Sequence, residues 1–326
     1  MAFDGIHNII VPSFDRTLRR LDPAGIEWDV EQAVAQGFAG TLLALNAGLT
    51  PSEMLKFVEI VIGKSASRLR VGVEMPLTSF AVAHDVLEAA AAAGADHTLF
   101  GVPQGFLPAD DGEVYDSYAP LAEIGLPVVL PVGPVGFPME LGGGIPWGAW
   151  ARLAPHERVT AVHVSTWMPQ QLFAALRLFS GRAAVGIGTP LLLGALPLLH
   201  REYGVSWLSP AHWELWQSPE HPYLVDYLGH VLAGRSDQAL DVHWRLAPAR
   251  GIAFGGGLLE SDLDGLPNYS LAKYLSWTVG GNGGVTREPA LHLQPQQQQA
   301  RAMMLRTLGI ESPTDEAEFL VGRSQR

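Results

Sequence analysis

Three ionisable side chains interrupt otherwise apolar or aromatic stretches: Glu74 in VGVEMPL, His163 in TAVHVSTW and His212 in PAHWELWQ. Charged side chains are rarely buried without a partner, so each position calls for a functional or a structural explanation. A carboxylate and an imidazole can together exchange protons with a substrate, or they can bind a divalent metal ion. We therefore predict Glu74, His163 and His212 as catalytic residues. The sequence has no HxH or HExxH spacing, so a divalent metal stays open as a cofactor and is not identified.

Each of these residues also has a structural explanation. Glu74 could pair with Arg70 or lie under a backbone amide. His163 could be a neutral core histidine bonded to Ser165 or Thr166, and His212 could pack against the neighbouring tryptophans. Buried polar groups are usually hydrogen-bonded for such structural reasons, so these alternatives stay open.

The elements that must position these side chains repeat along the first two thirds of the chain. Nearly continuous apolar runs, typical of buried parallel strands, alternate with stretches of helical periodicity. After Val11 the sequence PSFDRTL lacks a glycine-rich phosphate turn, which disfavours an open doubly wound sheet. Eight strand–helix units predict a closed (β/α)8 TIM barrel. The predicted strands are Ile6–Val11, Thr41–Leu45, Val71–Met75, His97–Gly101, Pro127–Val132, Val159–Ser165, Ala183–Ile187 and Val205–Leu208.

The alternation of strands and helices stops near Pro219, and only helical patterns follow. These patterns cover Tyr223–Leu232, Asp237–Phe254, Leu271–Thr278 and Pro295–Leu308. We expect a barrel over residues 1–218 and a C-terminal helical extension, packed on the barrel, over residues 219–326.

Active sites of such barrels form at the carboxyl ends of the strands and in the loops that follow. The Gly- and Pro-rich loop Gly133–Gly148 follows the fifth strand, and it could be a lid over the barrel mouth or a rigid surface loop. The residues at the strand ends that we predict to bind substrate are Ser13, Asn46, Gln104, Ser165 and Trp167.

Composition excludes several functions. The 326 residues include no cysteine, which removes disulfides and thiolate nucleophiles from consideration. The net charge of −12 opposes binding to the phosphates of nucleic acid. No uncharged apolar run approaches the ~20 residues of a membrane span, and the start of the chain lacks a signal-peptide pattern. We expect a cytoplasmic protein with a small-molecule substrate, no nucleic acid and no membrane association.

Segments along nearly the whole chain follow the order and spacing of a known family. These are GIHNIIVPSFD, QGFAGTLLALNAGLTPSEM, AAGADHTLFGVPQG, LPVVLPVGPVG and, in the tail, HVLAGRSDQALDVHWRLAP and PNYSLAKYLSWTVGGNGGVTREP. Together they resemble the dihydrodipicolinate synthase / N-acetylneuraminate lyase superfamily of (β/α)8 aldolases, including Lys273 and Arg287-Glu288-Pro289 of the tail. The resemblance implies a homodimer or homotetramer. The tryptophan-rich stretch Trp207–Trp216 is then a candidate interface, because aromatic side chains are enriched in interface cores.

The resemblance also implies catalytic positions, and this chain differs at each of them. Family members form a Schiff base on a lysine of the sixth strand, where this chain has His163, and an imidazole cannot form that imine. Lys56 and Lys64 belong to the second helix and Lys273 to the tail, so pyruvate imine chemistry should be absent. Where the family has a tyrosine on the fifth strand, this chain has Leu130, and the arginine that follows it falls at about Val135. The family's carboxylate-binding threonine pair matches Asn46-Ala47, and its aromatic pair matches Gln104-Gly105.

Two hypotheses follow. The first is a lyase-, aldolase- or hydratase-like enzyme that acts on a small oxo or hydroxy acid without a lysine Schiff base, with Glu74 and His163 moving protons α to a carbonyl. The second is a catalytically retired barrel that binds a metabolite or a partner protein, since fold alone does not establish activity. Convergence of the three catalytic candidates would favour chemistry, whereas a mouth filled by Leu130, Val135 and Trp167 would favour retirement.

Overall fold

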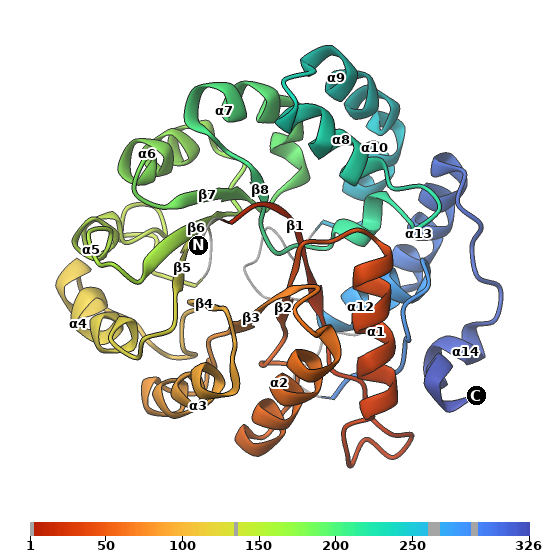
Figure 1. Ribbon diagram of the computed structural model, residues 1–326, viewed down its shortest axis with the longest axis horizontal. Coiled ribbons are helices and arrows are strands. Elements are labelled where there is room, and N and C mark those ends of the chain that lie inside the picture. Colours follow the sequence, from red (N-terminus) through yellow and green to blue (C-terminus); the bar gives the residue numbers. More distant parts are fainter. Residues whose placement is uncertain (1–2, 134–135, 260–267, 288–292) are drawn as a thin grey trace.

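A computed structural model describes residues 3–133, 136–259, 268–287 and 293–326. Its eight strands are parallel and hydrogen-bonded in sequence order, with β1 next to β8, so they form the closed barrel that the sequence predicts (Figure 1). The strands are β1 (Gly5–Ile10), β2 (Gly40–Leu43), β3 (Arg70–Glu74), β4 (His97–Leu99), β5 (Val128–Val132), β6 (Val159–Val164), β7 (Ala184–Ile187) and β8 (Trp207–Leu208).

Helices surround the strands on all sides (Figure 1). In the barrel these are α1 (Pro23–Ala35), α2 (Pro51–Ser65), α3 (Phe80–Ala93), α4 (Asp111–Ala122), α5 (Trp147–Leu153), α6 (Pro169–Phe179), the 3-10 helix η1 (Pro190–Ala195), α7 (Leu196–Tyr203) and η2 (Trp213–Trp216). The C-terminal region contributes α8 (Tyr223–Leu232), α9 (Ser236–Arg245), α10 (Ala247–Gly255), α12 (Tyr269–Trp277), α13 (Pro295–Leu308), α14 (Glu316–Val321) and η3 (Arg323–Gln325).

Two helical stretches are each divided in the structure. Residues Pro190–Tyr203 form η1 followed by α7, and the helix expected over Asp237–Phe254 is α9 followed by α10. Pro197 and Pro248 lie in the first turns of α7 and α10, where a residue without an amide hydrogen is tolerated. α8 completes the ring of helices beside α7, within the range expected to be tail (Figure 1). The domain boundary itself stays a prediction.

Aromatic rings fill the amino-terminal end of the barrel interior. Phe3, His7, His97 and Trp207 are almost fully buried and in mutual ring contact, with the His7 and His97 centroids 6.0 Å apart. Burial lowers the pKa of His7 to about 3 and that of His97 well below its usual value. Both imidazoles are therefore neutral, and they act as packing groups at the end of the barrel opposite the predicted mouth.

Two buried cations join the C-terminal helices to the barrel. Lys273 of α12 donates to the Val11 carbonyl at 2.9 Å, to Ser13 Oγ at 2.6 Å and to Asp29 Oδ2 of α1 at 2.7 Å. Arg301 of α13 donates to the carbonyls of Leu215 and Glu214 in η2. Lys273 is a tail residue, as expected, but its ammonium lies just beyond the carboxyl end of β1, which the sequence did not indicate.

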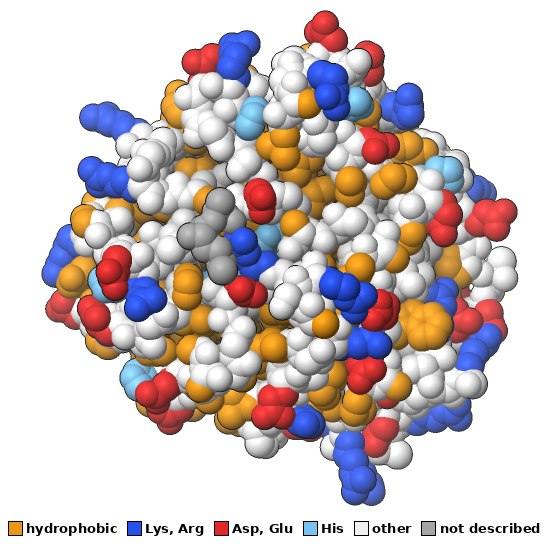
Figure 2. All heavy atoms as spheres, in the orientation of Figure 1, with side chains coloured by type: hydrophobic (Ala, Val, Ile, Leu, Met, Phe, Trp, Pro, Cys, Tyr) orange, Lys and Arg blue, Asp and Glu red, His pale blue; other side chains and the backbone are white. Residues whose placement is uncertain are grey.

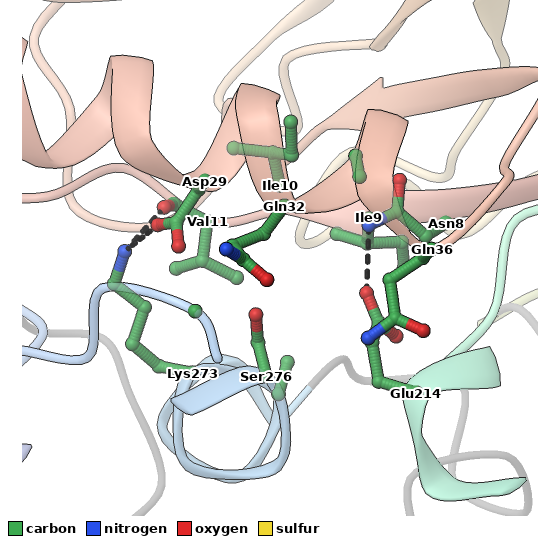
Figure 3. Close-up of a pocket in the computed structure, with 13 residues that line it drawn as sticks. Asn8, Ile9, Ile10, Val11, Asp29, Gln32, Gln36, Glu214, Lys273 and Ser276 are labelled. Atoms are coloured by element: carbon green, nitrogen blue, oxygen red, sulfur yellow. Dashed lines mark hydrogen bonds and ion pairs between the residues drawn. The ribbon is translucent and has the colours of Figure 1, made fainter. Parts of the chain in front are cut away.

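A cavity of about 10 Å³, room for about one water molecule, lies between β1, α1 and α12. Figure 3 shows the Lys273–Asp29 pair on one side of it and, on the other, Asn8, whose side-chain amide donates to Glu214 Oε1 at 2.6 Å. Burial raises the pKa of Glu214 to about 7. The cavity belongs to the junction between barrel and tail, outside the ring of strands.

The prediction that the tryptophans of Trp207–Trp216 form a subunit interface is wrong, because these side chains are buried within the chain. Trp207, Trp213 and Trp216 are at most 1% exposed. Trp207 fills the barrel interior, and Trp213 donates its indole N–H to the Ser209 carbonyl at 2.7 Å. These rings pack inside the chain, so they cannot contact a second copy of the protein.

The surface carries both signs of charge. On the face shown in Figure 2, Lys and Arg side chains are interspersed with Asp and Glu around the rim and do not gather into one patch. Among the helices of the described residues, none combines the length and apolar character needed to cross a membrane. The cytoplasmic location and the exclusion of nucleic acid stay predictions.

Replacing Lys273 with Met should lower the free energy of unfolding by about 3–5 kcal/mol, because Asp29 would keep a buried carboxylate without its cation. Lys56→Met is the matched control: that lysine pairs with Glu59 on the surface, and its loss should cost less than ~1 kcal/mol. Urea denaturation measures both. If Lys273→Met does not fold, Lys273→Met/Asp29→Leu should restore folding. Equal losses in the two single variants would contradict the junction described here.

Candidate active site at the barrel mouth

Glu74, the last residue of β3, is buried and held by hydrogen bonds. Its Oε2 accepts from the Tyr269 hydroxyl at 2.8 Å, from Asn46 Nδ2 at 3.1 Å and from the Asn46 backbone N–H at 3.4 Å. None of these partners carries a positive charge. The side chain expected to pair with Glu74, Arg70, lies at the other end of β3 over the Phe3 ring.

Asn46 joins the loops that follow β2 and β3. Besides contacting Glu74, its Nδ2 donates to the Met75 carbonyl at 3.1 Å, and its Oδ1 accepts from the Leu77 N–H at 2.9 Å. An asparagine can satisfy donors and acceptors at the same time, which a carboxylate cannot. Asn46 therefore fixes both loops and the orientation of the Glu74 carboxyl group.

Tyr269 is a site residue that the sequence reasoning missed. It comes from the first turn of α12, which Asn268 caps by accepting from the Leu271 N–H at 2.9 Å. With Ala272 of the same helix, Tyr269 packs against Val11 and Ala44 at the ends of β1 and β2. An asparagine cap before an aromatic residue predicts a helix start, but nothing local indicates a partner 195 residues away.

The surroundings of Glu74 favour proton uptake. Burial raises its pKa above the usual value, and the hydrogen bonds from Tyr269 and Asn46 offset part of that increase. The pKa of Tyr269 lies well above its usual range because of burial and then the nearby Glu74 charge. Of this pair, Glu74 is therefore the group that exchanges a proton more readily, while Tyr269 keeps its proton and stays a donor.

His163 projects from β6 into the barrel, as expected. Its ring lies against Gly188, the residue that follows β7, where an added Cβ would be only 2.3 Å from Cε1. Nδ1 is buried without a hydrogen-bond partner, and burial lowers the pKa of the ring to about 4. Burial therefore favours a neutral imidazole, and at Nδ1 no hydrogen bond supports the alternative in which Ser165 or Thr166 satisfies the ring.

The other predicted residues are distributed unevenly. His212 precedes η2, and burial lowers its pKa to about 4, so it is neutral as well. Ser13 is buried in the barrel–tail junction, where its hydroxyl accepts from Lys273 and from Asn282. Ser165 is half-buried against Gly133, whereas Gln104 and Trp167 are exposed. Within the described ranges, no three His, Asp or Glu side chains are placed to hold a metal ion.

Two of the three side chains expected to fill a retired mouth, Leu130 and Trp167, lie elsewhere. Leu130 packs in the main core between strands and helices, and Trp167 is 54% exposed. Phe137, from the loop expected as a lid, is buried against Trp150 and Tyr118. Val135 and Glu288-Pro289 lie outside the described residues.

Comparison with known proteins places the fold. No family model matches the sequence, and no curated protein matches it. Among solved structures, dihydrodipicolinate synthase from Aquifex aeolicus aligns over 96% of this chain and 100% of its own, with 17% identity and a TM-score of 0.78. The chloride-inhibited dihydrodipicolinate synthase from Acinetobacter baumannii, complexed with pyruvate, aligns over 95% and 100%, with 20% identity and a TM-score of 0.76. N-acetylneuraminate lyase from Fusobacterium nucleatum aligns over 95% and 99%, with 13% identity and a TM-score of 0.72.

These alignments span both the barrel and the C-terminal helices. The chain therefore has the overall fold of dihydrodipicolinate synthase and N-acetylneuraminate lyase, the proteins that the sequence resembles. At 13–20% identity this likeness shows the fold alone. What the site does must be argued from its own residues.

Removing the His163 imidazole should weaken the acid dependence of stability. The unfolded ring gains a proton below its ordinary pKa of 6.5 but the folded ring only near 4, so its protonation favours unfolding as pH falls from 6.5 to 4. His163→Phe should therefore lose less stability than the wild type across this window, by at most roughly 3 kcal/mol. Urea denaturation at several pH values measures the difference. Parallel stability curves for the two proteins would refute a neutral buried imidazole.

Proposed function

We propose that this protein is a lyase- or hydratase-like enzyme that moves a proton α to a carbonyl without a lysine Schiff base. The observation that carries the proposal is Glu74, a carboxyl group at a strand end with a raised pKa and no cationic partner. A general base works best when its pKa lies near the operating pH, and burial shifts a carboxyl group in that direction.

The neighbouring groups suit an enolate mechanism. Glu74 would take the α-proton, with Tyr269 and Asn46 fixing its orientation. Neutral His163 would donate or accept a hydrogen bond at the substrate oxygen, since a preorganised donor stabilises the charge that develops there. His212 is the third candidate for proton exchange. The proposed substrate-binding residues remain Ser13, Asn46, Gln104, Ser165 and Trp167.

Two observations on lysine support the exclusion of imine chemistry. The Lys273 ammonium is buried and donates to three acceptors, one of them a carboxylate, so it does not present a free amine. Lys56 and Lys64 pair with glutamates on α1 and α2, outside the barrel. The solved relative from A. baumannii binds pyruvate, so pyruvate is the reagent with which to test this exclusion.

A divalent metal would be a variant of the same mechanism, with Glu74, His163 and His212 as the ligands on offer. The described residues do not bring three such groups together, so no step is assigned to a metal here. Assembly into a homodimer or homotetramer likewise stays a proposal from the resemblance. A retired barrel is the competing reading, and the first experiment below decides between them.

Proton abstraction can be followed without the full reaction. In D2O the wild-type protein should catalyse exchange of α-hydrogens in small carbonyl compounds such as hydroxyacetone, dihydroxyacetone or pyruvate, observed by proton NMR. Glu74→Gln should lower the rate by about 10²–10⁴-fold, because the base is lost. His163→Ala should also lower it strongly while the protein stays folded.

Two further variants make the result specific. Glu88→Gln, which removes an exposed acid on α3, should leave exchange unchanged. Tyr269→Phe should retain exchange but move its acid limb to higher pH, since the carboxylate loses a stabilising donor. Wild-type exchange no faster than buffer with every compound would favour the retired barrel.

Incubation with pyruvate and sodium borohydride should leave the mass of the protein unchanged, because no lysine presents a free amine at the mouth. Peptide mapping by mass spectrometry measures this directly. An adduct on Lys56, Lys64 or Lys273 would overturn the exclusion of a Schiff base.

A further inference from the structure

Seven of the eight loops at the carboxyl ends of the strands carry no Lys or Arg. These seven loops connect each of the strands β2 to β8 to the helix that follows it. They cover residues 44–50, 75–79, 100–110, 133–146, 165–168, 188–189 and 209–212. The residues that the structure does not describe contain no Lys or Arg either, so all 21 lysine and arginine residues lie in the described part of the chain. His163 and His212 are neutral in their buried positions.

The cations nearest the strand ends are already neutralised or peripheral. Lys273 is paired with Asp29, as described above. Arg287 donates to Glu53 Oε2 at 2.7 Å and to two backbone carbonyls, and its guanidinium stacks on the Phe14 ring. Arg16, Arg19 and Arg20 are exposed in the loop after β1, which lies at the edge of the molecule beside α1 (Figure 1).

Neutral donors beside Glu74, at the ends of β2, β3 and β4, are also occupied. At the end of β2, the backbone and side-chain N–H groups of Asn46 donate to Glu74, so a carboxyl group of the protein itself fills this position. The helices after β2, β3 and β4 have their first amides capped by Thr50, Ser79 and Asp110. A substrate carboxylate entering here would meet a protein carboxyl group and no compensating charge.

From this arrangement we infer that the mouth takes an uncharged carbonyl or hydroxyl compound in preference to a carboxylate anion. The inference rests on the proposed function and narrows its substrate from the oxo or hydroxy acid that the resemblance implies. The physical reason is desolvation: an anion taken from water into a site without a cation loses its hydration and gains no ion pair. A ketone or alcohol oxygen needs only one or two hydrogen bonds, which His163 and Ser165 can supply.

Matched pairs of small molecules test the inference. Hydroxyacetone and pyruvate differ by a hydroxymethyl group in place of the carboxylate, as do dihydroxyacetone and hydroxypyruvate. Dissociation constants come from ligand-observed NMR titration of the intact protein. The uncharged member of each pair should bind at least about tenfold more tightly to the wild type.

Variants identify the cause. In Glu74→Gln the preference should shrink to a few-fold or invert, because the internal carboxyl group is gone. In Glu88→Gln, which removes an exposed acid on α3, the preference should be as in the wild type. Tighter or equal binding of the carboxylate by the wild type would overturn the inference, as would binding of neither member of either pair at millimolar concentration. A carboxylate whose binding is lost in Arg287→Met would overturn it too, and would name the cation responsible.

The binding and exchange experiments test the charge preference and the proposed catalysis separately, so either can be refuted without the other. Preferential binding of the uncharged compounds without α-hydrogen exchange would sink the proposed catalysis and keep the charge preference of the site. Exchange accompanied by tighter carboxylate binding would do the opposite.

Discussion

A carboxyl group buried at a strand end and held by neutral donors is the constraint on which the rest of the mouth depends. Without a cation, Glu74 needs every hydrogen bond it can obtain, and it draws them from two distant parts of the chain. Asn46 can serve it only while the loops after β2 and β3 are in register. Tyr269 can serve it only while α12 is docked on the barrel. The C-terminal helices are therefore part of the site and not simply attached to it.

The docking of those helices also explains why the buried cations lie at the junction between barrel and C-terminal helices and not at the mouth. Lys273 and Arg301 are the fully buried cations of the chain, and both bridge the C-terminal region to the barrel. A buried ammonium needs a counter-ion and acceptors, which Asp29, Ser13 and the end of β1 supply. Charge committed in this way is not available to a substrate. The mouth is left with a carboxyl group and neutral imidazoles, which suits proton transfer better than anion capture.

Both ends of the barrel interior contain histidine side chains that burial keeps neutral. At the amino-terminal end, the buried rings of His7 and His97 pack with Phe3 and Trp207. Near the carboxyl end of β6, His163 lies beside Gly188. The same low-dielectric environment thus keeps imidazoles neutral at both ends of the barrel, and only the carboxyl ends of the strands are where active sites of this fold form.

The sequence by itself determined the closed barrel, the helical tail and the placement of Glu74 and His163 at strand ends, because each depends on a local period or on a residue's position within one element. It did not determine the contacts that the buried polar and aromatic side chains make. Tyr269 reaches Glu74 across 195 residues, Lys273 reaches the end of β1 across 262, and the tryptophans expected at an interface turn inward. Only the tertiary structure decided these, since partners of buried polar and aromatic groups are chosen by three-dimensional packing, which leaves no local pattern.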